Sequence, residues 1–249
     1  MHVTNTFLRR GIRPLLVIAI AVAIAGIFPA VTRAGTIVHF DTNLVDFNVE
    51  LFDTAMPITV ANFLSYVSGS SYSSTLIHRS TTYNPADIQI IQGGGYLLSG
   101  NQLLPVVTSP PIVLESGTAT NVRGTIAMAR GAATDSATSQ FFFNIQDNPA
   151  LNGNYAVFGQ VVGSEGLAAL DTIGGVTVYD CTVQLGAAFS ELPLTSSSLD
   201  ASSLVLVNSI AAVPEPSTTT LVAVGLVATA LAHARRQKPT GRETAGKPR

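Results

Sequence analysis

The sequence predicts an all-β-dominated fold, a closed antiparallel barrel accompanied by two helices. Short apolar runs recur along the chain between Gly, Pro, Asn and Ser, which is typical of strands rather than of helices. Residues 45–52 alternate apolar and polar side chains with a period of two, as a half-buried strand does. Only two segments have helical spacing, so a parallel sheet with a helix between successive strands is not expected.

The first half of the domain is expected to contain strands at 36–40 and 45–52, followed by a helix. Pro57 suits the first turn of that helix, because a first turn leaves its N–H groups unpaired and proline has none. Gly69 is expected to end it. The apolar residues at helical spacing, which are expected to face the core, are Ile58, Ala61, Phe63, Leu64 and Val67.

The second half continues with strands and one more helix. Further strands are predicted at 74–79, 89–92, 123–130, 140–145 and 156–162. A short helix is predicted at 164–171, ended by Gly174 and Gly175, and a final strand at 203–208. The serine-rich segment 181–202 is expected to be a loop.

Residues 1–34 have the three parts of a secretory signal peptide. Arginines precede an apolar stretch at 15–28, and a small-residue cleavage site ends at Ala34. The alternative is a retained membrane anchor, for which the apolar stretch is short. The chain is therefore expected to be exported.

The other end of the chain has a stiff Pro-Glu-Pro at 214–216, an apolar stretch at 221–232 and then a basic cluster. Residues 213–238 thus resemble a PEP-CTERM sorting signal, which an exosortase reads in Gram-negative bacteria. The resemblance implies an exosortase-type partner and transient or C-terminal membrane association; the alternative is an ordinary membrane tail. Residues 239–249 are expected to be a disordered basic tail, which leaves 35–212 as the folded domain.

The folded domain carries very few positive charges. Between residues 35 and 213 the only basic residues are Arg79, Arg123 and Arg130, against thirteen Asp and Glu, so the formal charge of this span is −10. A nucleic-acid-binding surface needs clustered Lys and Arg, so nucleic acid is not an expected partner. Arg123 opens a predicted strand and is expected to pair with an acid; the alternative is contact with a substrate.

Metal, phosphate and nucleophile motifs are weak in this chain. Two of its four histidines lie in the terminal signals, which leaves no expected metal set. The glycines at 93–95 lack the lysine and helix of a phosphate loop, and no GxSxG motif occurs. Cys181 is the single cysteine, so no intrachain disulfide can form, and we expect it to be buried and inert. No cofactor is expected.

Five short sequence motifs stand in order along the domain. RGTIAMAR at 123–130 is followed by SATSQFFFN at 136–144. LIHR at 76–79 and IIQGGGY at 90–96 precede them, and LNGNYAVFGQV at 151–161 follows. In this order the motifs resemble the signature of the cyclophilin peptidyl-prolyl isomerases. The resemblance implies an eight-stranded barrel capped by two helices, and catalysis of rotation about Xaa-Pro bonds in proline-containing polypeptides.

The resemblance also implies the site residues. The catalytic set is Arg79, Gln92, Phe142 and Tyr155, and the substrate-binding set is Ile90, Ala129, Arg130, Gln140 and Leu151. Arg79 is the candidate donor to the prolyl nitrogen, because a guanidinium is always charged and offers several N–H groups. Gln92 is expected to orient Arg79 and to contact the substrate carbonyl; the alternative is that it caps a turn.

Phe142 is expected to form the floor of the proline pocket. Side chains alternate along a strand, so Phe142 points away from Phe141 and Phe143. If those two face the core, Phe142 faces the groove. The alternative is a third core phenylalanine.

The sequence departs from the family pattern at three places, and two of these departures weaken the expected pocket. Arg79 and Gln92 are further apart in sequence than in the family, so residues 80–88 carry an insertion. Gln89 and Ala150 stand where the family has aromatic residues, which removes apolar wall and weakens binding. Ile88 is placed to compensate.

The function expected from these observations is an exported, monomeric peptidyl-prolyl isomerase. It would assist folding in the periplasm, outer envelope or extracellular matrix of a Gram-negative-type bacterium. The alternatives are a weakened proline-peptide binding module and a structural component of the envelope or matrix.

Overall fold

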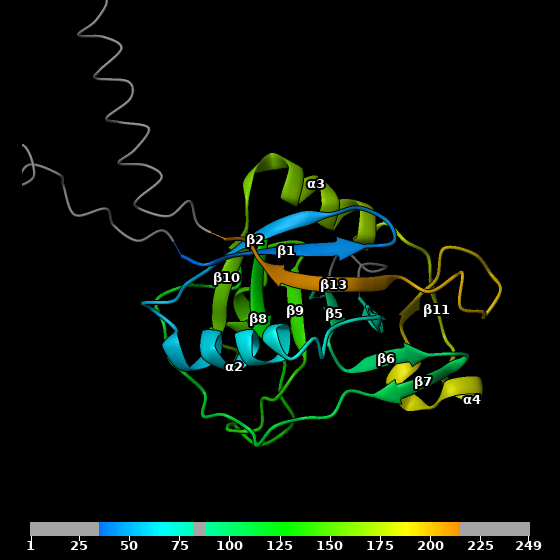
Figure 1. Ribbon diagram of the computed structural model, residues 1–249, viewed down its shortest axis with the longest axis horizontal. Coiled ribbons are helices and arrows are strands. Elements are labelled where there is room, and N and C mark those ends of the chain that lie inside the picture. Colours follow the sequence, from blue (N-terminus) through cyan, green and yellow to red (C-terminus); the bar gives the residue numbers. More distant parts are fainter. Residues whose placement is uncertain (1–34, 82–87, 215–249) are drawn as a thin grey trace, which may run out of the picture. The chain divides into compact units, whose positions relative to one another are not determined.

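The computed structural model describes residues 35–81 and 88–214, and most of the strands in these residues belong to one curled antiparallel sheet (Figure 1). The predicted signal peptide, most of the predicted sorting segment and the predicted basic tail lie outside the described residues. Among the helices that the structure describes, none is long and apolar enough to cross a membrane.

The sheet is built from short strands, some of which pair with the next strand in sequence and others with distant ones. In chain order the strands are β1 (Ile37–Thr42), β2 (Phe47–Leu51), β3 (Thr75–Leu76), β4 (Arg79–Ser80), β5 (Ile90–Gly93), β6 (Tyr96–Ser99), β7 (Gln102–Pro105), β8 (Thr125–Met128), β9 (Phe141–Asn144), β10 (Val157–Val161), β11 (Val178–Tyr179), β12 (Leu192–Pro193) and β13 (Leu206–Ala212). The pairing order of the main sheet is β4-β5-β9-β8-β10-β2-β1-β13-β3-β6-β7, and β11 pairs with β12 separately.

The predicted strand at 74–79 is divided into two short strands. β3 pairs with β13, whereas β4 pairs with β5. Ile77 and His78 lie between them, and their N–H groups donate to the carbonyls of Val205 and Gln92. This one stretch of chain therefore pairs with β13 through β3 and with β5 through β4. The eight-strand count of a closed barrel stays a prediction.

The helices are α2 (Pro57–Ser68), α3 (Gly163–Gly174) and α4 (Thr182–Leu185), with 3₁₀ turns η1 (Pro149–Leu151) and η2 (Ala187–Phe189). Pro57 begins α2 and Gly69 caps it, as predicted. The predicted core face was wrong at Ile58, which is 47% exposed, and at Ala61, which is exposed. Thr59 and Asn62 are buried instead, because the Asn62 amide donates to the Thr138 carbonyl at 2.7 Å.

Three regions differ from the sequence prediction. The hairpin of β6 and β7 was not predicted, although Gly100, with a φ of 59°, marks its turn. The predicted loop at 181–202 is wrong in part, since it contains α4, η2 and β12. The final strand is β13, which runs later than the predicted 203–208, because its ladder with β1 extends to Ala212.

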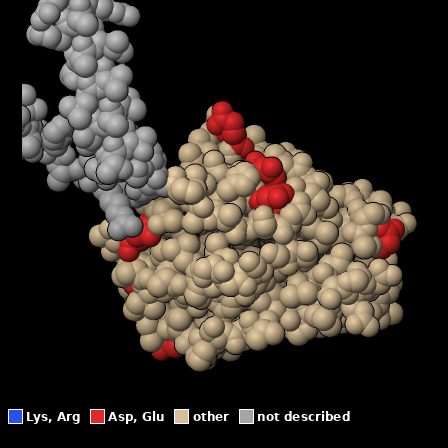
Figure 2. Space-filling view, viewed as in Figure 1, with Lys and Arg blue, Asp and Glu red and all other residues tan. Residues whose placement is uncertain are grey.

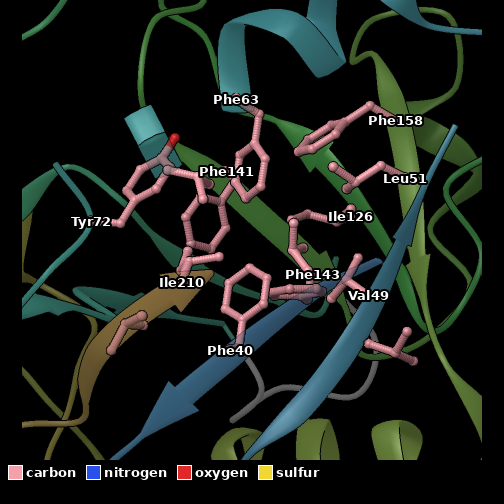
Figure 3. Packing of buried hydrophobic residues seen from close by; sticks show 14 of the residues in the cluster. Phe40, Val49, Leu51, Phe63, Tyr72, Ile126, Phe141, Phe143, Phe158 and Ile210 are labelled. Carbon is pink, nitrogen blue, oxygen red and sulfur yellow. The ribbon is translucent and has the colours of Figure 1, made fainter. Parts of the chain in front are cut away.

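Aromatic rings fill the interior of the curled sheet (Figure 3). The ring of Phe40 lies 5.7 Å from that of Phe141 and 5.4 Å from that of Phe143, both edge to face. α2 adds Phe63 to this cluster. A smaller apolar cluster anchors the segment after α3, and it contains Leu76, Cys181, Phe189, Leu192, Leu194 and Leu204. Cys181 is buried, as predicted, and burial raises the pKa of its thiol.

Candidate active site

A cavity of about 780 Å³ opens beside β4, β5 and β9. Every residue of the two predicted site sets lines it, although they come from five separate stretches of the chain. These residues are Arg79, Ile90, Gln92, Ala129, Arg130, Gln140, Phe142, Leu151 and Tyr155. The structure therefore brings the whole predicted site together.

Strand register explains why three of these residues stand side by side. Arg79 in β4 lies opposite Gln92 in β5, and Gln92 lies opposite Phe142 in β9. Residues directly opposite in an antiparallel pair point to the same face, with their Cβ atoms about 4.5–5.5 Å apart. The sheet thus presents a cation, an amide and an aromatic ring in one row.

Phe142 is the floor of the cavity. It is only 2% exposed and packs in a cluster with Ile90, Ala127, Ala129, Leu151 and Val157, separate from the interior cluster. Phe141 and Phe143 belong to the interior, so the predicted alternation is confirmed. The ring of Tyr155 meets that of Phe142 edge to face at 5.4 Å. The floor is therefore apolar and closely packed, which suits an apolar ring.

The amide of Gln92 is paired with a second amide. Its Nε2 donates to Oε1 of Gln140 at 2.8 Å, and among the described residues no hydrogen bond joins the side chains of Gln92 and Arg79. Gln140 lies so close to Gly95 that an added Cβ would approach its amide to 2.8 Å. The missing side chain at Gly95 thus leaves room for the Gln92–Gln140 pair. Gly94 has a φ of +74°, a backbone conformation that favours glycine.

Arg79 is held by a residue that the sequence did not indicate. Its Nε donates to Oε2 of Glu191 at 2.6 Å, and both residues line the cavity. Glu191 lies just before β12, in the segment predicted to be a loop. The other lining residues that the sequence did not indicate are His78, Thr81, Tyr96, Ala187, Ala188 and Ser190.

The other two arginines are also engaged. Arg130 donates from Nε to the Asn154 carbonyl at 2.7 Å and lies over the Tyr155 ring, 5.2 Å from its centroid. Nη2 of Arg123 donates to both carboxylate oxygens of Asp171 at 2.7 Å, so Arg123 pairs with an acid as expected. On the face shown in Figure 2, acidic side chains are visible and no described Lys or Arg is. In the described part of the chain, no three His, Cys, Asp or Glu are grouped to hold a metal ion.

The predicted departures have clear positions. Ile88, Ile90 and Gln92 line the cavity, whereas Gln89 and Ala150 are not among its described lining residues. Alternation along this stretch places the even-numbered residues towards the cavity. Ile88 therefore supplies apolar wall, as expected of it. The remainder of the predicted insertion at 80–88 lies outside the described residues, apart from Ser80 and Thr81.

A buried amide network fixes the wall that carries Leu151. Oδ1 of Asn148 accepts from the Gln89 N–H at 3.0 Å, and its Nδ2 donates to the Gln89 carbonyl at 3.0 Å and to Oδ1 of Asn144 at 2.8 Å. Asn144 in turn donates to Oγ1 of Thr125 at 2.9 Å. The network ties the residue before β5 to the turn that leads into η1.

Replacing Asn148 with alanine is expected to lower the free energy of unfolding by about 2–3 kcal/mol, because buried polar groups lose their partners. Urea denaturation monitored by circular dichroism measures the change. The control is Asn101→Ala on the exposed turn of the β6–β7 hairpin, which should stay within about 0.5 kcal/mol of wild type. Equal effects of the two variants would contradict a structural role for the network.

His78 is a buried neutral imidazole beside Arg79. It is 3% exposed, its ring lies edge to face against Tyr96 at 5.1 Å, and its Nδ1 has no partner among the described residues. Burial, with the positive charge of Arg79 as a smaller cause, lowers the pKa of His78 to about 4. The ring is therefore uncharged at neutral pH.

This lowered pKa predicts a pH-dependent stability. The unfolded chain binds a proton on His78 near pH 6.5 and the folded chain near pH 4, so stability is lost as the pH falls through that window. Between pH 7.5 and pH 5 the loss from His78 is expected to be about 2 kcal/mol. Urea denaturation at both pH values should show a smaller loss in His78→Gln, which retains only the titration of the other groups. Equal losses would refute this prediction.

Comparisons with known proteins identify one family. The family model "Cyclophilin type peptidyl-prolyl cis-trans isomerase/CLD" matches residues 37–186. The chain is 38% identical over 164 residues to a peptidyl-prolyl cis-trans isomerase of Acinetobacter baylyi, covering 63% of this chain and 82% of that one. It is 39% identical over 148 residues to peptidyl-prolyl cis-trans isomerase B of Escherichia coli, covering 56% and 84%.

A solved structure has the same fold. It is a cyclophilin type peptidyl-prolyl cis-trans isomerase of Cryptosporidium parvum, crystallised in the presence of the dipeptide Ala-Pro. Its TM-score is 0.51 at 22% identity, and the alignment covers 72% of this chain and 99% of that one.

Proposed function

This chain belongs to the cyclophilin-type peptidyl-prolyl cis-trans isomerase family, and from that premise we propose that it isomerises Xaa-Pro bonds of exported proteins at the cell envelope. The observation that carries its chemistry is the row of Arg79, Gln92 and Phe142 across three paired strands. A cation, an amide and an apolar floor then face one cavity. Prolyl isomerisation needs these groups and no covalent catalyst.

The barrier to rotation is the resonance of the amide C–N bond, about 18–20 kcal/mol. In the twisted state that resonance is lost, and the prolyl nitrogen gains a lone pair. Arg79 donates a hydrogen bond to that lone pair, which stabilises the twisted state more than the planar one. In the planar cis and trans states the nitrogen has no free lone pair, so it accepts no such hydrogen bond. The donor therefore lowers the barrier in both directions.

The remaining site residues hold the peptide during rotation. The proline ring packs on Phe142, between Ile90 and Leu151. Gln92 and Gln140 offer amide groups to the peptide backbone beside the proline, and Tyr155 closes the far side of the floor. Because its proline ring is held on Phe142, the peptide rotates only about the prolyl bond.

The sequence outside the described residues supports the location. The signal-peptide pattern at 1–34 leads to export, and the sorting pattern at 213–238 leads to processing by an exosortase-type enzyme. Uncatalysed isomerisation takes about 10–100 s, which limits the folding of newly exported chains. The clients are proline-containing polypeptides of the periplasm, outer envelope or extracellular matrix.

We also propose that the sheet is an eight-stranded closed barrel. Setting aside the β6–β7 hairpin and counting β3 with β4 as one strand leaves eight strands in the pairing order. The pairings of β3 with β13 and of β4 with β5 support closure at that strand.

The test of function is isomerisation of an Ala-Xaa-Pro-Phe peptide series by the purified protein. Acceleration for at least one Xaa supports the proposal, and binding of the same peptides without acceleration would favour a proline-binding module. Fractionation of cells that express an epitope-tagged chain tests the location. A chain that stays in the cytoplasm would overturn the export proposal.

A further inference from the structure

The ion pair between Arg79 and Glu191 joins the family's part of the chain to a segment outside it. The family model matches residues 37–186, and Glu191 lies beyond that match. Its Oε2 accepts from Arg79 Nε at 2.6 Å. We propose that Glu191 is a positioning residue, which holds the guanidinium of Arg79 in place for the prolyl nitrogen. This inference rests on the proposed function of Arg79.

Glu191 is itself held on both sides. Phe189 and Leu192 are 4% and 0% exposed and belong to the same apolar cluster. The Glu191 carbonyl accepts from the N–H of Ser80, the residue after Arg79, at 2.8 Å. The carboxylate and the arginine are therefore carried by backbones that are bonded to each other.

The geometry of the bond suits a positioning role. Glu191 takes the Nε–H, and within the described residues the two terminal nitrogens of Arg79 make no hydrogen bond. Those nitrogens are the donors that remain for a substrate. A fork of N–H groups fixed at one corner keeps its plane, whereas a free arginine samples many rotamers.

Stability is a weaker explanation for the pair. The Arg79 and Glu191 side chains are 42% and 19% exposed, and solvent screens pairs of this kind so that they contribute little to folding. The main effect of the ion pair is therefore to place the guanidinium of Arg79 beside the cavity.

Kinetics of the full chain test the proposal. Glu191→Ala is expected to lower kcat about tenfold to thirtyfold with KM within about twofold, because Arg79 must then be ordered in each catalytic cycle. Glu191→Gln should stay within about threefold of wild type, since its amide oxygen still accepts the Nε–H. The matched control is Asp171→Ala, which breaks the ion pair of Arg123 away from the cavity and should leave kcat unchanged. A Glu191→Ala enzyme as fast as wild type, or faster, would overturn the proposal.

A double-mutant cycle separates a positioning role of Glu191 from damage to the fold. In the Arg79→Ala background, Glu191→Ala should change the residual rate by less than about twofold, because a positioning residue acts through Arg79. A further tenfold loss would show that Glu191 acts through the fold and would refute the inference.

Nuclear magnetic resonance decides the case if the wild-type chain has no isomerase activity, which would refute the proposed function itself. The Arg79 Nε–H signal is identified by its absence in Arg79→Lys. A sharp signal that is lost or shifted in Glu191→Ala supports the positioning role. A signal unchanged in Glu191→Ala overturns it.

Discussion

Arg79→Ala is expected to lower kcat/KM for prolyl isomerisation by about a hundredfold or more. Loss of one transition-state donor typically raises a barrier by about 3–4 kcal/mol. Arg79→Lys should recover only part of the rate, because an ammonium group lacks the planar fork and the Nε–H that Glu191 accepts. Protease-coupled or fluorescence isomerisation assays with a single Ala-Xaa-Pro-Phe peptide measure both variants.

Arg123→Ala is the matched control for Arg79. Arg123 is also a half-exposed arginine in an ion pair, but its partner is Asp171 in α3 and it does not line the described cavity. Its replacement should leave kcat/KM within about threefold of wild type. Equal losses from the two arginines would mean that the domain's charge, rather than the donor, sets the rate.

Phe143→Ala is expected to lower the free energy of unfolding by about 3–5 kcal/mol, the largest stability effect that we predict. Phe143 is 1% exposed and its ring contacts those of Phe40, Phe47 and Phe141. Truncation removes apolar contact and leaves a cavity that the surrounding rings cannot fill. Guanidinium denaturation with two spectroscopic probes gives the value.

Phe142→Leu is the control on the neighbouring residue. It keeps apolar volume at a buried position, so its loss of stability should stay below about 1.5 kcal/mol, while peptide binding weakens because the flat floor is gone. If Phe143→Ala does not fold, Phe143→Leu supplies the measurement. A loss below 1 kcal/mol for Phe143→Ala would contradict close packing of the aromatic interior.

Site residues were predictable from the sequence where they belong to a recognisable motif or where strand alternation fixes their face. The run Phe141-Phe142-Phe143 has only two faces, so assigning the outer pair to the interior leaves Phe142 for the cavity. The face of α2 was harder to predict, because buried Thr59 and Asn62 replace the apolar residues that hydrophobic spacing favours. A hydrogen bond to the loop before β9 decides that orientation, and hydrophobicity does not report it.

Glu191 could not have been predicted in the same way. It lies 112 positions after Arg79, in a segment whose only strand has two residues. Periodicity needs several turns or strand residues to become visible, and this segment offers too few. The only available signal was an acid placed between Phe189 and Leu192, which suggests an anchored position but not its partner.

The direct pairing of Arg79 with Gln92 has a consequence for how the protein can be altered. The backbone pairing of β4 with β5 sets the distance between Arg79 and Gln92. This distance does not depend on the number of residues that connect the two strands. In general, doubling the number of residues in a flexible loop adds only about 0.6 kcal/mol to the entropic cost of closing it. A reporter peptide or affinity epitope could therefore be grafted into this connection while the reacting groups keep their spacing.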